Sequence, residues 1–266
     1  MKRKTYWKDL LQSFTGSKGR FLSILTLMML GSLAVVGLKV ASPNMERTAW
    51  AYLKDTNAAD MTVIADYGLD QADQEELQTL SGADVEFGYM TDFTLANSED
   101  AIRIFSNTDK ISKFQVTEGR LPEKEDELAL ADFWKDRYQI GQVIHLSQKN
   151  ASNSQLKRES YTITGFIHSP DIFSKTDMGS SASGNGNLSA YGVVTKDNFK
   201  SSVYTIARLR FNSLTDVNPF SVDYEKKLEE EEATLKELVA DNGQARLEKM
   251  KKDAQKSLDE GKKQLD

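Results

Sequence analysis

The chain of 266 residues contains no cysteine, two histidines and four prolines. Without cysteine it has no disulfide, no thiolate metal ligand and no thiol nucleophile. His145 and His168 are too few for a zinc site of the HExxH kind, and we expect both to be structural. In HSPD, Pro170 favours a turn over a catalytic pair of His168 and Asp171.

Other catalytic and binding patterns are also missing. The serines of 180–189 stand in no nucleophile elbow, and the glycines of TGSKGR lack the phosphate-binding spacing GxxxxGK[ST]. The acidic run Glu229–Glu232 lacks the calcium-loop pattern and is expected to be a solvated helix face. The sequence therefore predicts no enzyme, no metal site and no cofactor.

The 34 basic residues are outnumbered by 40 acidic ones and are unevenly placed. The formal net charge is -6, which argues against nucleic acid as a partner because phosphate binding needs clustered Lys and Arg. Residues 1–20 carry six basic side chains and one acid, whereas residues 21–38 carry no charge. The mean hydropathy of -0.51 averages over these unlike parts.

The uncharged stretch 21–38 has the length of a membrane span. Thirteen of its 18 residues are apolar and lie on every side of a helix, whereas a surface helix of a soluble domain would keep a polar face. At about 1.5 Å per residue the helix covers roughly 27 Å, close to the hydrocarbon thickness of about 30 Å. The stem of Lys39 can snorkel, and Pro43 is expected to stop the helix. We predict a transmembrane helix over 21–41.

Two other interpretations of this stretch remain, a cleaved signal peptide and a buried helix of a soluble protein. A signal peptide usually has a shorter apolar region of about 7–15 residues, and Lys39 and Pro43 disturb the candidate cleavage sites. Basic residues before the span place the N-terminus in the cytoplasm, so that the chain from about Pro43 onward lies outside it. The predicted location is the cell membrane.

The segment 1–20 is predicted to be a basic amphipathic helix in the cytoplasmic interface, and a flexible basic tail is the alternative. The pattern consists of apolar residues at helical spacing among polar ones: Tyr6, Trp7, Leu10, Leu11 and Phe14 among Lys4, Lys8 and Gln12.

Residues 45–220 read as one extracytoplasmic domain of the mixed α+β class. Helices are expected over 45–55 and after the N-cap Asp70, with a helical turn over 133–138 and a Gly- and Ser-rich loop over 169–188. Strands are expected over 61–65, 85–96, 101–106, 114–116, 127–131, 143–146, 161–173, 190–195 and 203–211.

Residues 223–266 are nearly all helix formers and predict a long helix or coiled-coil segment. Its apolar residues follow an eleven-residue repeat that needs a partner helix: Leu247, Met250, Ala254, Leu258, Gly261 and Leu265. Asn242-Gly243 predicts a kink or a turn. Because the pattern is unfinished at Asp266, the sequence is expected to be a truncated form of a longer one.

Several stretches resemble the FtsX-like (MacB-type) permeases of ABC transporters. SKGRFLSILTLMMLGSLAVVGLKVASPNM is similar to their first transmembrane helix. VTEGRLPEKEDELALADF, YQIGQVIHL and YTITGFIHSP, followed by SAYGVV and YTIARLRF, resemble their extracytoplasmic core domain in the family's order. The resemblance covers most of residues 5–215.

This resemblance implies the N-terminal part of a permease subunit, which transmits conformational change between a cytoplasmic ATPase and an extracytoplasmic domain. It implies as partners the lipid bilayer, the ATPase, a second permease copy and an unknown extracytoplasmic ligand or protein. Gly119, Arg120 and Pro122 would shape a turn, without a binding role. The chain departs from the family in having one span instead of four. The alternative is a single-pass membrane-anchored adaptor or sensor that dimerises through its helical extension.

Overall fold

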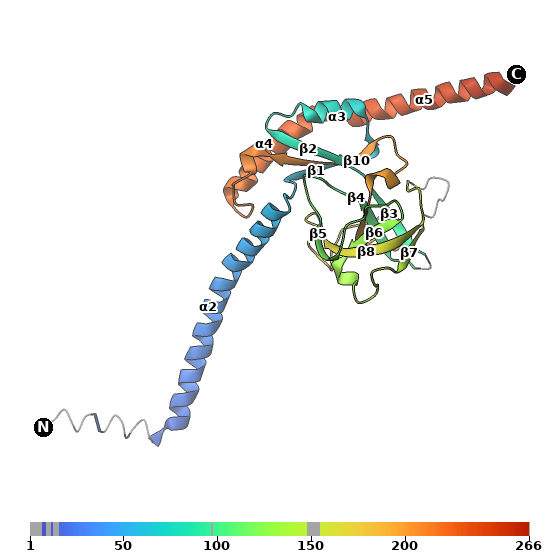
Figure 1. The fold of residues 1–266 in the computed structure, drawn as a ribbon. Coiled ribbons are helices and arrows are strands. Elements are labelled where there is room, and N and C mark those ends of the chain that lie inside the picture. Colours follow the sequence, from blue (N-terminus) through green and yellow to red (C-terminus); the bar gives the residue numbers. More distant parts are fainter. Residues whose placement is uncertain (1–6, 9–11, 13–15, 97, 148–154, 266) are drawn as a thin grey trace. The chain divides into compact units, whose positions relative to one another are not determined.

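The computed structural model describes residues 7–8, 12, 16–96, 98–147 and 155–265 (Figure 1). These residues form two compact units, which divide between Ala51 and Tyr52. The amphipathic helix predicted for 1–20 falls largely outside the described residues, and it stays a prediction.

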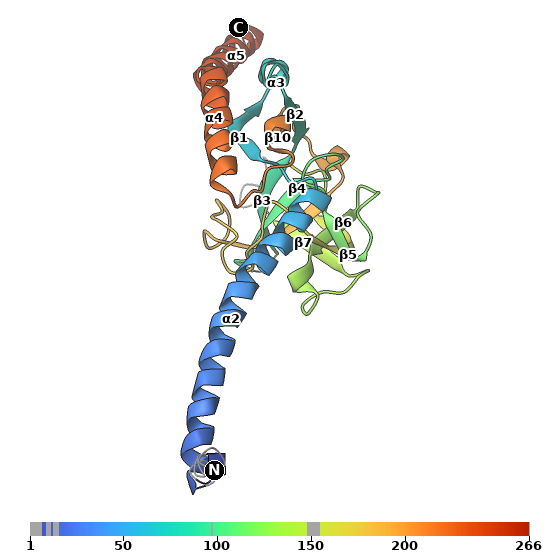
Figure 2. The same cartoon turned by 90° about the vertical axis from the view of Figure 1, so that its left-hand side faces the viewer.

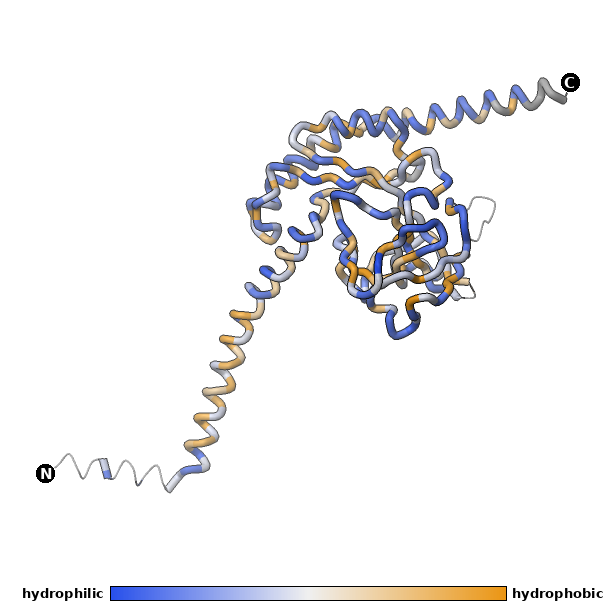
Figure 3. Tube along the Cα trace, viewed as in Figure 1, coloured by the Kyte–Doolittle hydropathy of each residue, from blue (hydrophilic) through white to orange (hydrophobic). Residues whose placement is uncertain are grey.

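Helix α2 runs without a break over Lys18–Asp55, and its residues as far as Thr48 are exposed. Its first half forms a continuous apolar stretch in Figure 3. By length and composition α2 is the helix that could cross a membrane within the described part of the chain. The helix expected over 45–55 is present, but the predicted stop at Pro43 is wrong. A proline removes one backbone donor, and a long helix can continue past that single loss when the residues around it are helical.

The second unit confirms the α+β class. A three-stranded sheet has the order β1-β10-β2, from Met61–Leu69, Tyr204–Phe211 and Ala83–Gly88. One face of this sheet is covered by α3 (Gln71–Gln78) and α4 (Val222–Leu238), and their Leu77 and Leu235 pack with Leu209 and Phe211. In Figures 1 and 2 these helices lie along the sheet.

The larger sheet closes on itself. Its order is β5-β8-β6-β9-β4-β3-β7, and β7 pairs again with β8, so that six strands form a ring and β5 adds to β8 outside it. A closed ring leaves no free edge among its members. The strand bounds are β3 Met90–Leu95, β4 Ala101–Ser106, β5 Gln115–Gly119, β6 Glu127–Ala131, β7 Val143–Ser147, β8 Ser160–His168 and β9 Leu188–Val194.

Alternation along the strands of the ring divides its side chains into two cores. Leu128 and Leu130 of β6 pack with Ile102 and Ile104 of β4 in one cluster. The alternate residues of the same strands join a second cluster, which also contains Ile206 of β10. The second cluster therefore joins the ring to the three-stranded sheet.

Most predicted elements are present, with shifted ends. Strand β1 extends four residues beyond the predicted Ala65, and the predicted helical turn over 133–138 is a 3₁₀ turn, Asp132–Trp134. Two further 3₁₀ turns occupy Lys196–Asn198 and Asn212–Leu214. Asp70 caps α3 as expected: its carboxylate accepts from the backbone N–H of Ala72 and Asp73.

The predicted interruption near Asn242 is confirmed as a break. Helix α4 ends at Leu238, and α5 runs over Asn242–Leu265. Along α5, Leu247 is half-buried, whereas Met250 and Leu258 are 41% and 61% exposed. Met250, Ala254 and Leu258 of α5 therefore have no covering element in the described structure.

Candidate functional site

The end of helix α2 is built as a Schellman motif. The backbone N–H of Ala58 donates to the carbonyl of Leu53 at 2.8 Å, and that of Asn57 donates to Lys54 at 3.1 Å. Asn57 has φ 49°, the left-handed conformation that this motif requires and that asparagine adopts more readily than most residues. The helix thus ends in a defined geometry.

A loop over 107–113 is hydrogen-bonded to this helix end. The N–H of Ser112 donates to the carbonyl of Asn57, and that of Lys113 to Thr56, both at 2.8 Å. In return the Asn57 amide donates to the carbonyl of Lys110 at 2.8 Å. Ser112 is fully buried and also has positive φ, 54°. We call residues 52–58 with this loop the junction.

Glu86 of β2 holds the loop from the other side. Its carboxylate accepts from the backbone N–H of Asp109 at 2.7 Å, of Lys110 at 2.8 Å and of Ile111 at 2.6 Å. The side chain is nearly buried. Hydrogen bonds to an ionised acceptor are stronger than those between neutral groups. The end of α2 is therefore connected to the three-stranded sheet through a short series of hydrogen bonds.

An ion pair links the two sheets. Arg208 of β10 is fully buried, and its Nε donates to Asp171, in the loop after β8, at 2.8 Å. Its guanidinium lies 5.4 Å from the ring centroid of Phe105, and both Nη atoms lack a hydrogen-bond partner among the described residues. Removing Asp171 would leave the buried guanidinium of Arg208 without compensation.

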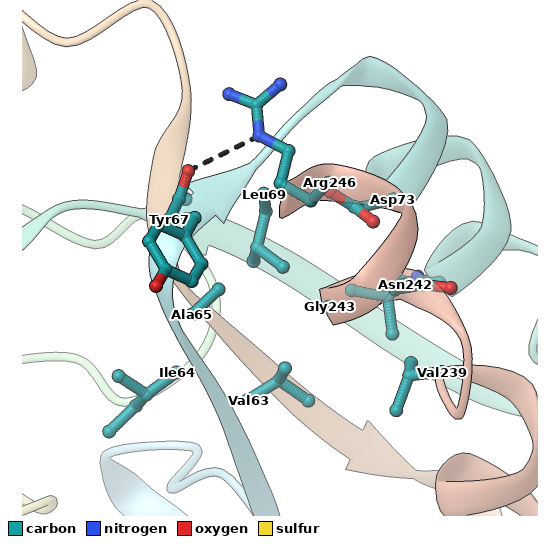
Figure 4. Close-up of a pocket in the computed structure, with 12 residues that line it drawn as sticks. Val63, Ile64, Ala65, Tyr67, Leu69, Asp73, Val239, Asn242, Gly243 and Arg246 are labelled. Carbon is teal, nitrogen blue, oxygen red and sulfur yellow. Dashed lines mark hydrogen bonds between the residues drawn. The ribbon is translucent and has the colours of Figure 1, made fainter. Parts of the chain in front are cut away.

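A cavity of about 310 Å³ lies between β1 and the start of α5 (Figure 4). Its walls are mostly apolar and include Val63, Leu69, Leu77 and Val239. Polar contacts hold α5 at its rim: Arg246 and Lys249 pair with Asp70 at 3.1 and 2.8 Å, and Asn242 donates to Glu76 at 2.6 Å. The hydrogen bond from Lys249, with those from backbone N–H groups, lowers the pKa of Asp70. The first two turns of α5 are thus fixed to the domain.

The turn at Gly119 has a structural role. Gly119 has φ 73°, and a Cβ there would collide with the carbonyl oxygen of Thr164. Arg120 makes a two-pronged pair with Glu127 at 2.7 and 2.5 Å, which lowers the pKa of Glu127 to about 2. The predicted turn is present, and Pro122 follows it as a buried loop residue.

The residues considered for catalysis stand apart from one another. His145 contacts Ser160 at 2.8 Å, and His168 lies 3.9 Å from Asp132. Asp171 pairs with Arg208 instead of His168. The run 180–189 contains an exposed bend and the start of β9, and three of the four glutamates in 229–232 are exposed. Among the described residues no group of three or more His, Asp or Glu could hold a metal ion.

Comparison with known proteins gives little further information. No family model matches the chain, and no curated protein matches it. Among solved structures, the chain is similar to the extracellular domain of the noncanonical ABC-type transporter YknZ from Gram-positive bacteria. That chain is 14% identical, the match covers 67% of this chain and 87% of that one, and the TM-score is 0.34.

Proposed function

We propose that this chain is the N-terminal portion of a permease subunit of an ABC transporter of the FtsX/MacB type. The sequence resemblance described above and the long apolar helix α2 near the N-terminus support this assignment. In the proposal, residues 1–20 lie at the cytoplasmic face and 21–41 cross the membrane. Residues 45–220 form the extracytoplasmic domain, and 223–266 are a helical extension.

The junction is the observation that carries the proposal. A domain merely tethered to the membrane needs no more than a flexible linker after its anchor. Here the chain leaves α2 through a Schellman motif whose Thr56 and Asn57 are hydrogen-bonded to the loop 107–113. Glu86 bonds the same loop to β2. A displacement of the helix end would therefore be transmitted to the sheet.

The partners of the proposed subunit are a cytoplasmic ABC ATPase, the lipid bilayer, a second permease copy and an extracytoplasmic ligand or protein. The chain itself contributes no catalytic group in this proposal. Its acidic balance makes nucleic acid an unsuitable partner.

A second candidate is a membrane-anchored adaptor or sensor that dimerises through its extension. The exposed apolar side chains of Met250 and Leu258 on α5 favour it, because such a seam needs a partner helix. This candidate requires no ATPase.

The test probes membranes that contain the native protein. The probe is an antiserum raised against the extracytoplasmic domain. We expect a polypeptide heavier than 29.8 kDa that co-precipitates with an ATPase after detergent extraction. A band at 29.8 kDa that resists alkaline washing and brings down no ATPase would contradict the permease and favour the adaptor. A lighter, soluble band would show that the apolar stretch is a cleaved signal peptide.

A further inference from the structure

A second cavity, of about 230 Å³, lies beside the last turn of α2. At roughly 30 Å³ per water molecule, this is room for a ligand of fragment size. The cavity combines aromatic walls with basic side chains, and its lining includes Tyr52, Phe133, His168, Phe173, Lys175 and Tyr191.

Two edge-to-face aromatic pairs contribute to the walls. The ring of Tyr52 meets that of Phe173 at a centroid distance of 5.8 Å, and Phe133 meets Tyr191 at 6.0 Å, each with an interplanar angle of 73°. Phe173 is 62% exposed, so that its ring still has apolar surface to bury. Aromatic surroundings of this kind favour a flat aromatic ligand.

One polar group of a residue that lines the cavity lacks a partner. The hydroxyl of Tyr52 is buried and has no hydrogen-bond partner among the described residues, an arrangement that costs free energy. Burial, with smaller contributions from Tyr191 and Asp171, raises the pKa of Tyr52 to about 12, so its hydroxyl keeps its proton at neutral pH. The hydroxyl is therefore a donor in need of an acceptor.

The surrounding charges favour an anionic acceptor. The Lys175 ammonium lies 6.0 Å from the ring centroid of Phe133 and has no carboxylate partner in the described part of the chain. The two nearby carboxylates are already paired, Asp132 with Lys135 and Asp171 with Arg208. Each of these acids is thus neutralised, and Lys175 leaves one positive charge at the cavity.

We propose that this cavity binds a small aromatic carboxylate. The aromatic ring lies against the walls of Tyr52, Phe133 and Phe173, and the carboxylate accepts from the Tyr52 hydroxyl and faces the Lys175 ammonium. Tyr52 belongs to the last turn of α2, which is hydrogen-bonded to the loop 107–113. A ligand bound beside Tyr52 therefore stabilises this arrangement of the turn by mass action. The site needs neither an ATPase nor a second copy, so it is independent of the transporter assignment.

Binding is tested with the full chain in nanodiscs and 4-fluorophenylacetate as the probe, observed by ¹⁹F NMR against empty nanodiscs. The neutral control probe is 4-fluorophenylacetamide. We expect the carboxylate to bind and the amide to bind about tenfold more weakly, since hydrogen bonds to charged groups are the stronger ones.

Three variants locate the site. Tyr52→Phe keeps the ring and removes the donor, and is expected to weaken binding about tenfold. Lys175→Gln is expected to weaken it about threefold, because its charge is exposed and screened. Lys200→Gln, an exposed lysine outside the cavity, is the matched control and should bind as the parent does. Unchanged far-UV circular dichroism excludes misfolding. No binding of 4-fluorophenylacetate, equal binding of both probes, or affinities indifferent to Tyr52→Phe and Lys175→Gln would overturn the proposal.

Discussion

The carboxylate of Glu86 should hold the junction together, and Glu86→Gln tests this with little change of shape. One carboxylate oxygen accepts from the N–H of Asp109, and the other accepts from Lys110 and Ile111. Glutamine offers one oxygen, and its NH₂ group would face a backbone N–H. At best two of the three bonds remain, now to a neutral acceptor.

The expected loss follows from these bonds. A hydrogen bond to a charged acceptor contributes about 1.5–3 kcal/mol and a neutral one about 1 kcal/mol. Losing one bond and weakening two gives a loss of about 3 kcal/mol in the free energy of unfolding. For a unit of this size that corresponds to a drop in Tm of roughly 6–12 °C.

The loss is measured by urea unfolding of the full chain in detergent micelles, and the local effect by hydrogen exchange at residues 109–111. The matched control is Glu118→Gln, an exposed glutamate of β5 whose carboxylate accepts no hydrogen bond in the described structure. The reasoning is refuted by a loss below about 1 kcal/mol together with unchanged exchange at those three amides.

Three further predictions concern single positions. Asn57→Ala should lower the free energy of unfolding by about 1–2 kcal/mol, because alanine disfavours the left-handed conformation and lacks the side-chain amide that donates to Lys110. Asn57→Gly should lower it less, because glycine adopts that conformation readily. Urea unfolding compares the two variants. Gly119→Ala should destabilise by more than about 2 kcal/mol, because its Cβ would meet the carbonyl of Thr164 and φ is positive; unfolding by heat checks this. The pair of Arg120 and Glu127 should make stability depend on pH, because the pKa of Glu127 is lowered from 4.5 to about 2: its contribution is present above pH 4.5 and is lost as the pH falls toward about 2. Glu127→Gln should remove that slope from unfolding curves measured between these pH values.

The sequence was informative where one local rule decides the structure. Asp70 before a helical pattern predicts an N-cap, and the capping box is present. The strand at 127–131 is found with the predicted ends. The rule that proline ends a helix fails at Pro43, because several helical turns lie on either side of it in α2.

The junction was missed because its parts are distant along the chain. Glu86 reads as an ordinary polar residue of an alternating strand, and its three partners lie 23–25 residues away. Asn57 gave a usable signal, since asparagine just past a helix end is typical of a left-handed cap. The unpartnered hydroxyl of Tyr52 and the buried Arg208 depend on tertiary packing, which no local pattern shows.

The most direct test of the central claim is the side of the membrane on which each end of α2 lies. Because the chain has no cysteine, single substitutions report cleanly with a membrane-impermeant maleimide. Lys226→Cys, exposed on α4, should be labelled in intact cells, and Lys8→Cys only after the membrane is permeabilised. Labelling of Lys8→Cys in intact cells, or protection of Lys226→Cys until permeabilisation, would contradict a cytoplasmic N-terminus and an extracytoplasmic domain.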